Sequence, residues 1–141
     1  WNRCVIPALG HSNFKIEDGT MEFGVGHHGE AGTKVEKLKS ASEMAQEMAE
    51  TILNDFDFEE GKEVAVMLSS LGATPVMELY VLYDEVEKVL AKAGHKVWKT
   101  YIGNYVTSLD MNGASLTIVD LDDEIKETLS EPAVPIGMKN Y

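Results

Sequence analysis

Two adjacent histidines and a glutamate, His27, His28 and Glu30, stand among glycines in the stretch MEFGVGHHGEAG. A histidine side chain can act as a base, a metal ligand or a nucleophile. Glycine adopts backbone conformations that other residues resist, and it lets other atoms approach closely. No other stretch of the sequence combines reactive side chains with so permissive a backbone. We therefore expect the functional site to lie here.

The residues before the histidines predict a strand that holds this loop. Met21, Phe23 and Val25 alternate with glutamate or glycine, which is the period-two pattern of a half-buried strand. If the alternation continues into the loop, His27 and His28 point to opposite sides, so only one of them can face a substrate.

Other interpretations of the glycine stretch are weaker. The letters GVGHHG match the dinucleotide-binding pattern, but that site needs a helix beginning at the last glycine, and the next residues are not amphipathic. A metal site from His27, His28 and Glu30 is disfavoured because neighbouring side chains in extended backbone diverge. His11 and His95 could join only if the fold brought them close. From the residues alone, His28 as an ordinary loop histidine and as a catalytic residue both stay open.

A second tight loop, SSLGAT, follows an unbroken apolar run and precedes a helical pattern. It lacks the lysine of a phosphate-binding P-loop. Thr74 is expected to cap the helix, with Pro75 as its first residue. Anion binding at this helix start is the less favoured alternative.

The remaining patterns predict an α/β fold. Ser40 and Glu43 form a capping box ahead of a helix, and an apolar strand, the SSLGAT loop, a helix and another strand form a βαβ unit. Asn112-Gly113 predicts a type I′ turn. We expect strands at 4–9, 14–16, 64–68 and 96–102, helices at 41–53, 75–93 and 124–129, a hairpin over 105–121, and irregular chain at 33–39.

Composition limits the function classes. The 141 residues carry 12 Lys and Arg against 24 Asp and Glu, a net charge of −12, so nucleic acid and anionic membrane surfaces are poor partners. With 44% hydrophobic residues the chain can form one domain, residues 1–141. The single cysteine, Cys4, fits a reducing, cytoplasmic location. The sequence opens on Trp1 within a strand pattern, so we expect it to be a piece of a longer polypeptide.

Four segments together resemble the C-terminal lobe of the substrate-binding K subunit, or K domain, of dihydroxyacetone kinases. The resemblance implies an α/β, two-layer lobe with a mixed β-sheet and helices, a DegV-like second domain whose N-terminal lobe lies upstream. The segments are VIPALG (5–10), MEFGVGHHGEAG (21–32), LGATPVMELY (71–80) and IGNYVTSLDMNGASLTIVDLDDE (102–124).

The resemblance also implies a chemistry. In that family the histidine before Gly-Glu-(Pro/Ala)-Gly binds the substrate carbonyl covalently as a hemiaminal, and this position is His28, with Gly26 and Gly29 beside the substrate. It implies dihydroxyacetone as substrate, no metal or cofactor in this chain, and Mg-ATP or a phosphorylated carrier on a partner kinase subunit or domain. It further implies a homodimer of the full subunit and a lobe that is inactive with Mg-ATP alone.

Two positions depart from the family pattern. His27 stands where an aliphatic residue is usual, and Ser69-Ser70 stands where two asparagines are common, which puts in doubt any role of those amides. A non-catalytic dihydroxyacetone sensor that acts on a transcription regulator would keep His28, and a purely structural lobe would leave it idle. Both stay open as alternatives to the kinase.

Overall fold

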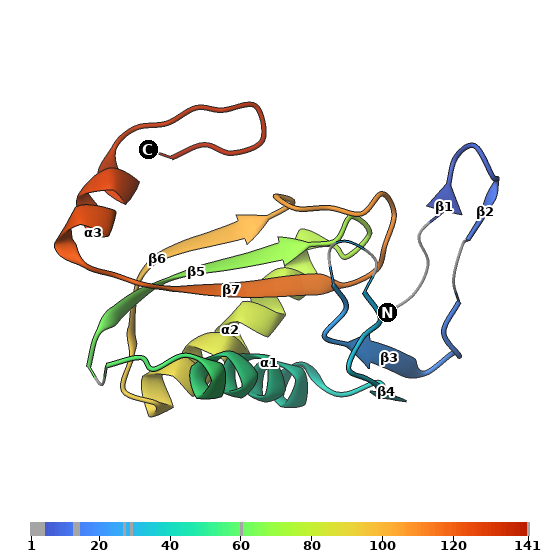
Figure 1. Ribbon diagram of the computed structural model, residues 1–141, viewed down its shortest axis with the longest axis horizontal. Coiled ribbons are helices and arrows are strands. Elements are labelled where there is room, and N and C mark those ends of the chain that lie inside the picture. Colours follow the sequence, from blue (N-terminus) through green and yellow to red (C-terminus); the bar gives the residue numbers. More distant parts are fainter. Residues whose placement is uncertain (1–4, 13–14, 27, 29, 60, 141) are drawn as a thin grey trace.

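The computed structural model describes residues 5–12, 15–26, 28, 30–59 and 61–140. These residues form short β-hairpins near the N-terminus, a central sheet, and helices packed against it (Figure 1). The strands are β1 (Val5–Ile6), β2 (His11–Ser12), β3 (Thr20–Phe23), β4 (Lys34–Lys37), β5 (Glu63–Ser70), β6 (Lys96–Gly103) and β7 (Ala114–Asp120); the helices are α1 (Ala41–Asp55), α2 (Val76–Lys92) and α3 (Asp123–Ser130).

The central sheet has the order β6-β5-β7, and it is mixed as predicted. Strand β5 runs parallel to β6, with Leu68 opposite Ile102, and antiparallel to β7, with Leu68 opposite Leu116. Helices α1 and α2 lie on one face of the sheet (Figure 1). The expected two-layer α/β lobe is therefore confirmed.

The apolar side chains of β5 explain this arrangement. Val64, Val66 and Leu68 are fully buried, and they form one core with residues of both helices. A central strand with neighbours on both sides and helices above it is expected to read as a continuous apolar run. The parallel pairing of β5 with β6 across α2 confirms the βαβ unit. The core residues contributed by the helices include Met44, Ala45, Leu79, Leu82, Val86 and Leu90.

The predicted helix ends are mostly correct. Ser40 caps α1 in a capping box, since its hydroxyl accepts from the Glu43 amide and the Glu43 carboxylate accepts from the Ser40 amide. Asp122 caps α3 by accepting from the Ile125 amide at 2.7 Å. The prediction for Thr74 is wrong. Pro75 is the N-cap of α2, and the Thr74 hydroxyl is engaged by the loop before β7 instead.

The predicted hairpin over 105–121 is also wrong. Strand β7 pairs with β5 rather than with the residues before it, and 104–113 form a loop. Among the described residues, those with positive φ do not include Asn112 or Gly113, so the type I′ turn does not form. Burial of the apolar side of β7 against α1 and β5 outweighs the local turn signal.

The N-terminal predictions need smaller corrections. The strand expected at 4–9 is reduced to β1, which pairs with β2 across a turn at 7–10, and Cys4 lies outside the described residues. The predicted strand 14–16 has no strand at its described positions. Residues 34–37, expected to be irregular, form β4 and pair antiparallel with β3. A strand with this many charged residues can form here because most of its residues are exposed on the hairpin surface.

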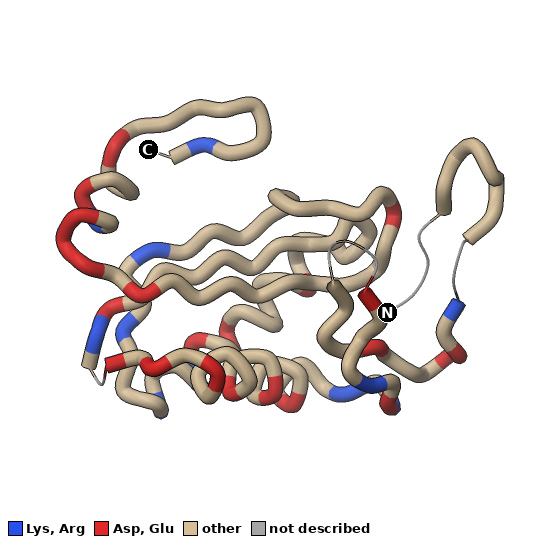
Figure 2. Tube along the Cα trace, in the orientation of Figure 1, with Lys and Arg blue, Asp and Glu red and all other residues tan. Residues whose placement is uncertain are grey.

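Ion pairs join the β3–β4 hairpin to α1. Lys34 and Lys39 both reach the Glu47 carboxylate, Lys39 at 2.5 Å, and Lys39 also lies 2.8 Å from Glu36. These lysines lower the pKa of Glu47, chiefly through the hydrogen bond from Lys34. Charged residues gather around α1, β4 and α3, while the strands of the central sheet carry their few charges towards one end (Figure 2). In the part of the chain described, no helix has the length and apolar character that a bilayer span requires.

Candidate active site

The β3–β4 hairpin presents the glycine loop. Phe23 pairs with Lys34, so 24–33 connect the two strands. The Thr33 amide donates to the Phe23 carbonyl at 2.8 Å, and the Gly32 amide donates to the Glu22 carboxylate at 2.8 Å. These bonds close the base of the loop. Strand β3 ends at Phe23, so the expectation that the strand runs on to Val25 is wrong, and His27 lies outside the described residues.

Glu30 organises the tip of the loop around His28. Its carbonyl accepts from the Gly26 amide at 3.1 Å, and its carboxylate Oε2 accepts from the His28 amide at 3.0 Å. The other carboxylate oxygen, Oε1, lies 3.8 Å from Nδ1 of the His28 ring. A Cβ atom at position 26 would overlap the Glu30 side chain, which explains why glycine is required there.

The His28 side chain is open to solvent. It is 90% exposed, and the Glu30 side chain is 63% exposed. His27 and Gly29, two of the predicted site residues, lie outside the described residues. In the described ranges, no cluster of three or more His, Cys, Asp or Glu residues could hold a metal ion. The arrangement presents an accessible imidazole with a carboxylate on its Nδ1 side.

A cavity of about 500 Å³ lies beside this loop. One wall is formed by β3 and the start of the glycine loop, up to Gly26. Another wall is formed by residues of the loop between β6 and β7, between Val106 and Gly113, and by the start of β7. Methionines contribute to its lining, and methionine adapts its shape to different occupants. The methionines are Met21, Met44, Met48 and Met111.

Two buried hydroxyl groups hold the cavity wall that the loop 104–113 forms. Ser69 is 1% exposed, and its Oγ accepts from the Tyr105 and Val106 amides at 3.0 Å each. Thr74 is 4% exposed, and its Oγ accepts from the Gly113 amide at 2.9 Å. Neither role was predicted from the sequence. The available signal was the pair of small polar residues Ser69 and Ser70 at the carboxyl end of a buried strand, where α/β proteins place their sites.

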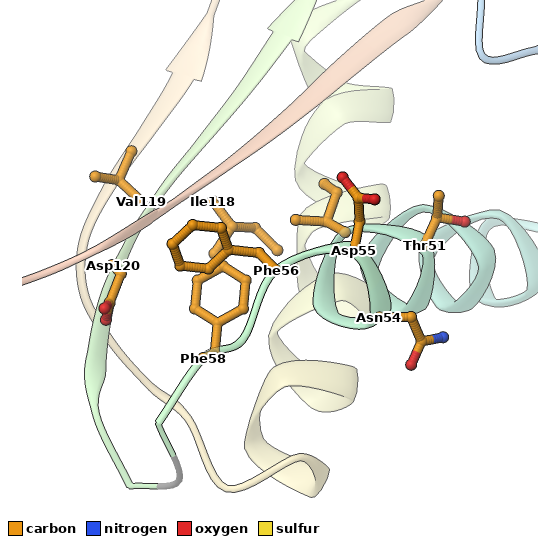
Figure 3. Close-up of a pocket in the computed structure, with 9 residues that line it drawn as sticks. Thr51, Asn54, Asp55, Phe56, Phe58, Ile118, Val119 and Asp120 are labelled. Carbon is orange, nitrogen blue, oxygen red and sulfur yellow. The ribbon is translucent and has the colours of Figure 1, made fainter.

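A second depression, of about 910 Å³, lies at the other end of β7. Figure 3 shows Phe56 and Phe58 beside Ile118, with Asn54 turned away from them. The two phenylalanine rings meet edge to face at 4.9 Å between centroids. The described residues that line this depression include no histidine, lysine or cysteine, so they offer no nucleophile or base of that kind. Size alone therefore does not identify the site.

A comparison with protein families shows to which family this chain is related. The Dak1 domain matches residues 1–136, which is nearly the whole chain. The chain belongs to the Dak1 family. The expected resemblance to the substrate-binding subunit of dihydroxyacetone kinases is therefore confirmed at the level of the family.

Individual Dak1 relatives agree with this assignment. The dihydroxyacetone-binding subunit DhaK of a PTS-dependent dihydroxyacetone kinase from Listeria innocua is 41% identical over 121 residues, 86% of this chain and 37% of the relative. This Dak1 chain thus spans less than two fifths of that protein.

Solved Dak1 structures have the same fold. The dihydroxyacetone kinase operon co-activator Dha-DhaQ superposes with a TM-score of 0.84 at 28% identity, covering 93% of this chain and 41% of that chain. The dihydroxyacetone kinase of C. freundii superposes with a TM-score of 0.78 at 27% identity, covering 92% of this chain and 23% of that chain.

Proposed function

We propose that this chain is the lobe of a dihydroxyacetone kinase substrate-binding subunit that holds dihydroxyacetone covalently through His28. The observation that carries the proposal is the exposed His28 ring at the tip of a glycine loop, with the Glu30 carboxylate on its Nδ1 side. Family membership and the dihydroxyacetone-binding relative support the choice of substrate. Gly26 and Gly29 are proposed as further substrate-binding residues; Gly29 lies outside the described residues.

The proposed step is a reversible addition. A nitrogen of the neutral imidazole attacks the ketone carbon, a C–N bond forms, and the carbonyl π bond breaks. The carbonyl oxygen takes up a proton, and the ring gives up its N–H proton, so the product is a neutral hemiaminal with no other reactant. Polyols such as glycerol lack the carbonyl and cannot react. The covalent bond then fixes the triose so that a terminal hydroxyl can meet the transferred phosphoryl group.

The position of Glu30 determines which ring nitrogen of His28 attacks the carbonyl. Its Oε1 faces Nδ1 of His28, so the ring proton is favoured on Nδ1 and the lone pair on Nε2. The attacking atom is then Nε2. As Nε2 adds to the carbonyl, positive charge develops on the ring, and the nearby carboxylate stabilises it.

The phospho-donor is assigned to a partner. The sequence has no P-loop and no dinucleotide-binding helix after its glycines. Mg-ATP or a phosphorylated carrier is therefore proposed to be bound by a separate kinase subunit or domain, and this lobe is proposed to form no triose phosphate with Mg-ATP alone. The homodimer, the upstream lobe and the cytoplasmic location stay predictions.

Intact-protein mass spectrometry after incubation with dihydroxyacetone tests the covalent step. The wild-type protein is expected to gain the mass of one dihydroxyacetone, and His28→Ala to lose this adduct. His27→Ala is the matched control and should keep it. Loss of the adduct in His27→Ala alone would move the assignment by one residue, and an adduct that survives both changes would contradict it.

A sensor is the second candidate, because the co-activator Dha-DhaQ superposes with a TM-score of 0.84. Such a protein would bind the triose without turning it over. Triose phosphate formation by the full subunit with its kinase partner and phospho-donor separates the two functions. Adduct formation without turnover under these conditions would favour the sensor over the kinase.

A further inference from the structure

We propose that Ser69 and Thr74 are positioning residues for the substrate at His28. They hold the loop 104–113, which lines the same cavity as the start of the glycine loop, and so they set the space available to the non-carbonyl end of the ketose. This inference rests on the proposed function, because it takes His28 as the attachment point. Neither residue is expected to touch the reacting carbonyl.

The Ser69 hydroxyl is fully used in fixing one end of the wall. Its Oγ accepts from two consecutive amides, Tyr105 and Val106, and donates to the Ser70 carbonyl at 3.1 Å. A hydroxyl offers one donor and two acceptor sites, so all of its capacity is satisfied. Two adjacent amides that converge on one buried oxygen fix the direction of the chain as it leaves β6.

The Thr74 hydroxyl fixes the other end of the wall. Its Oγ accepts from the Gly113 amide and lies 2.8 Å from both the Asn112 side-chain oxygen and the Gly113 carbonyl, to one of which it donates. The wall is thus held at one end by Ser69, near the carboxyl end of β5, and at the other by Thr74, four residues after β5. Both anchoring side chains are buried, at 1% and 4% exposure, which restricts their movement.

The wall lies close to the reactive loop. Gly26 and Val106 line the same cavity, and His28 follows Gly26 by two residues. Since consecutive Cα atoms are about 3.8 Å apart, the Cα atoms of Gly26 and His28 are separated by at most about 7.6 Å. The His28 side chain is exposed and does not itself line the cavity, so we place only the free end of a triose attached to it in the cavity, where this wall would limit how it lies.

The first of these anchors also accounts for Ser69, which stands where the family commonly has asparagine. At Ser69 the structure needs a hydrogen-bond acceptor for two amides, and a hydroxyl oxygen supplies it as an amide oxygen would. Removing that oxygen leaves two amides without their buried partner, which costs free energy unless the loop moves. Movement of the loop widens the cavity and weakens orientation of the substrate.

The test uses the full protein and measures how the amount of adduct rises with the dihydroxyacetone concentration. Ser69→Ala is expected to raise the half-saturating concentration by about tenfold, the effect of losing one or two buried hydrogen bonds. The adduct at saturation stays at one triose per chain, because His28 is intact. Ser69→Thr, which keeps the hydroxyl, should restore near wild-type binding. Thr74→Val should weaken binding in the same way, whereas Thr117→Val, at an exposed threonine of β7, should not.

A second readout follows the wall itself. Hydrogen exchange of the Tyr105 and Val106 amides should accelerate in Ser69→Ala, while exchange in α2 is unchanged. Wild-type binding and unchanged exchange in Ser69→Ala would overturn this inference while leaving the role of His28 intact. Absence of any adduct on the wild-type protein would instead overturn the proposed function. Equal weakening by Thr117→Val would show a general loss of stability and would also overturn the inference.

Discussion

The sheet-and-helix layer and the glycine loop differ in almost every physical respect. In the layer, Val64, Val66 and Leu68 are fully buried, and their contacts are spread over two neighbouring strands and two helices. In the loop, His28 is 90% exposed, and the bonds around it come from its near neighbours in sequence. The most deeply buried part of the molecule is thus held by contacts between segments far apart in sequence, whereas the loop around His28 is held by local hydrogen bonds.

Two polar joints tie the loops of the site to the layer. Ion pairs of Lys34, Lys39 and Glu47 attach the β3–β4 hairpin to α1, in addition to the packing of Met21 and Phe23 on the core, and the hydroxyls of Ser69 and Thr74 attach the loop 104–113 to β5 and the segment that follows it. A change in the layer should therefore affect the whole molecule, while a change at a joint should mainly affect the geometry of the site.

The largest expected effect comes from opening the layer. Leu68→Ala removes a fully buried side chain from the middle of the core, and it should lower the free energy of unfolding by about 2–5 kcal/mol. Val35→Ala on β4, where the side chain is 59% exposed, should change it by less than about 0.5 kcal/mol. Denaturant unfolding of both variants measures the contrast. Similar losses in the two variants would break the comparison between layer and hairpin.

The next effect concerns the close contact between the wall and the end of β5. Gly72 has φ of +133°, and a Cβ atom there would overlap the Leu109 carbonyl oxygen. Gly72→Ala should therefore cost about 2–3 kcal/mol, at the upper end of the range for a strained backbone position. Gly61 also has positive φ, +80°, but open space around it, so Gly61→Ala is the matched control. It should cost about 1–2 kcal/mol, from backbone conformation alone. Equal losses in thermal unfolding would mean that the contact with Leu109 yields at no cost.

The smallest expected effect tests how much the ion pairs of Glu47 contribute to stability. The pKa of Glu47 is lowered in the folded protein, so its contribution to stability is present above the unfolded pKa, about 4.3, and is lost as the pH falls through the folded value. Glu47→Gln should lower the melting temperature at pH 7 by up to about 4 °C. The difference from wild type should shrink towards zero in acid. A difference that is independent of pH would show that packing of Glu47, rather than its charge, joins the hairpin to α1.

The sequence predicts the layer well because its signals are strong and local. An apolar run buried on both faces, a capping box at Ser40 and a strand–helix–strand order each have one physical interpretation. The family resemblance adds the mixed sheet and His28. The prediction of a hairpin at Asn112-Gly113 is wrong because these two residues indicate only a local turn preference. The pairing of β7 is determined instead by burial of its side chains against β5 and α1.

The parts of the site that escaped prediction depend on long-range contacts. The bond between Ser69 and Val106 spans 37 residues, and the bond between Thr74 and Gly113 spans 39. No spacing rule connects such positions. Glu30, by contrast, acts on residues within four positions of itself, and its place in the loop could be predicted to matter, although the side of the ring that it faces could not.

The strand order β6-β5-β7 has a consequence for the order of folding. Strands β5 and β6 meet across a single helix, whereas β7 returns to the far side of β5 from beyond β6 and the loop 104–113. Closing the shorter connection costs less chain entropy, so the β5–α2–β6 unit is expected to assemble first. The wall of the cavity, anchored at both of its ends to the segment around β5, would then form only as β7 docks. The binding cavity would accordingly be among the last features to appear as the chain folds.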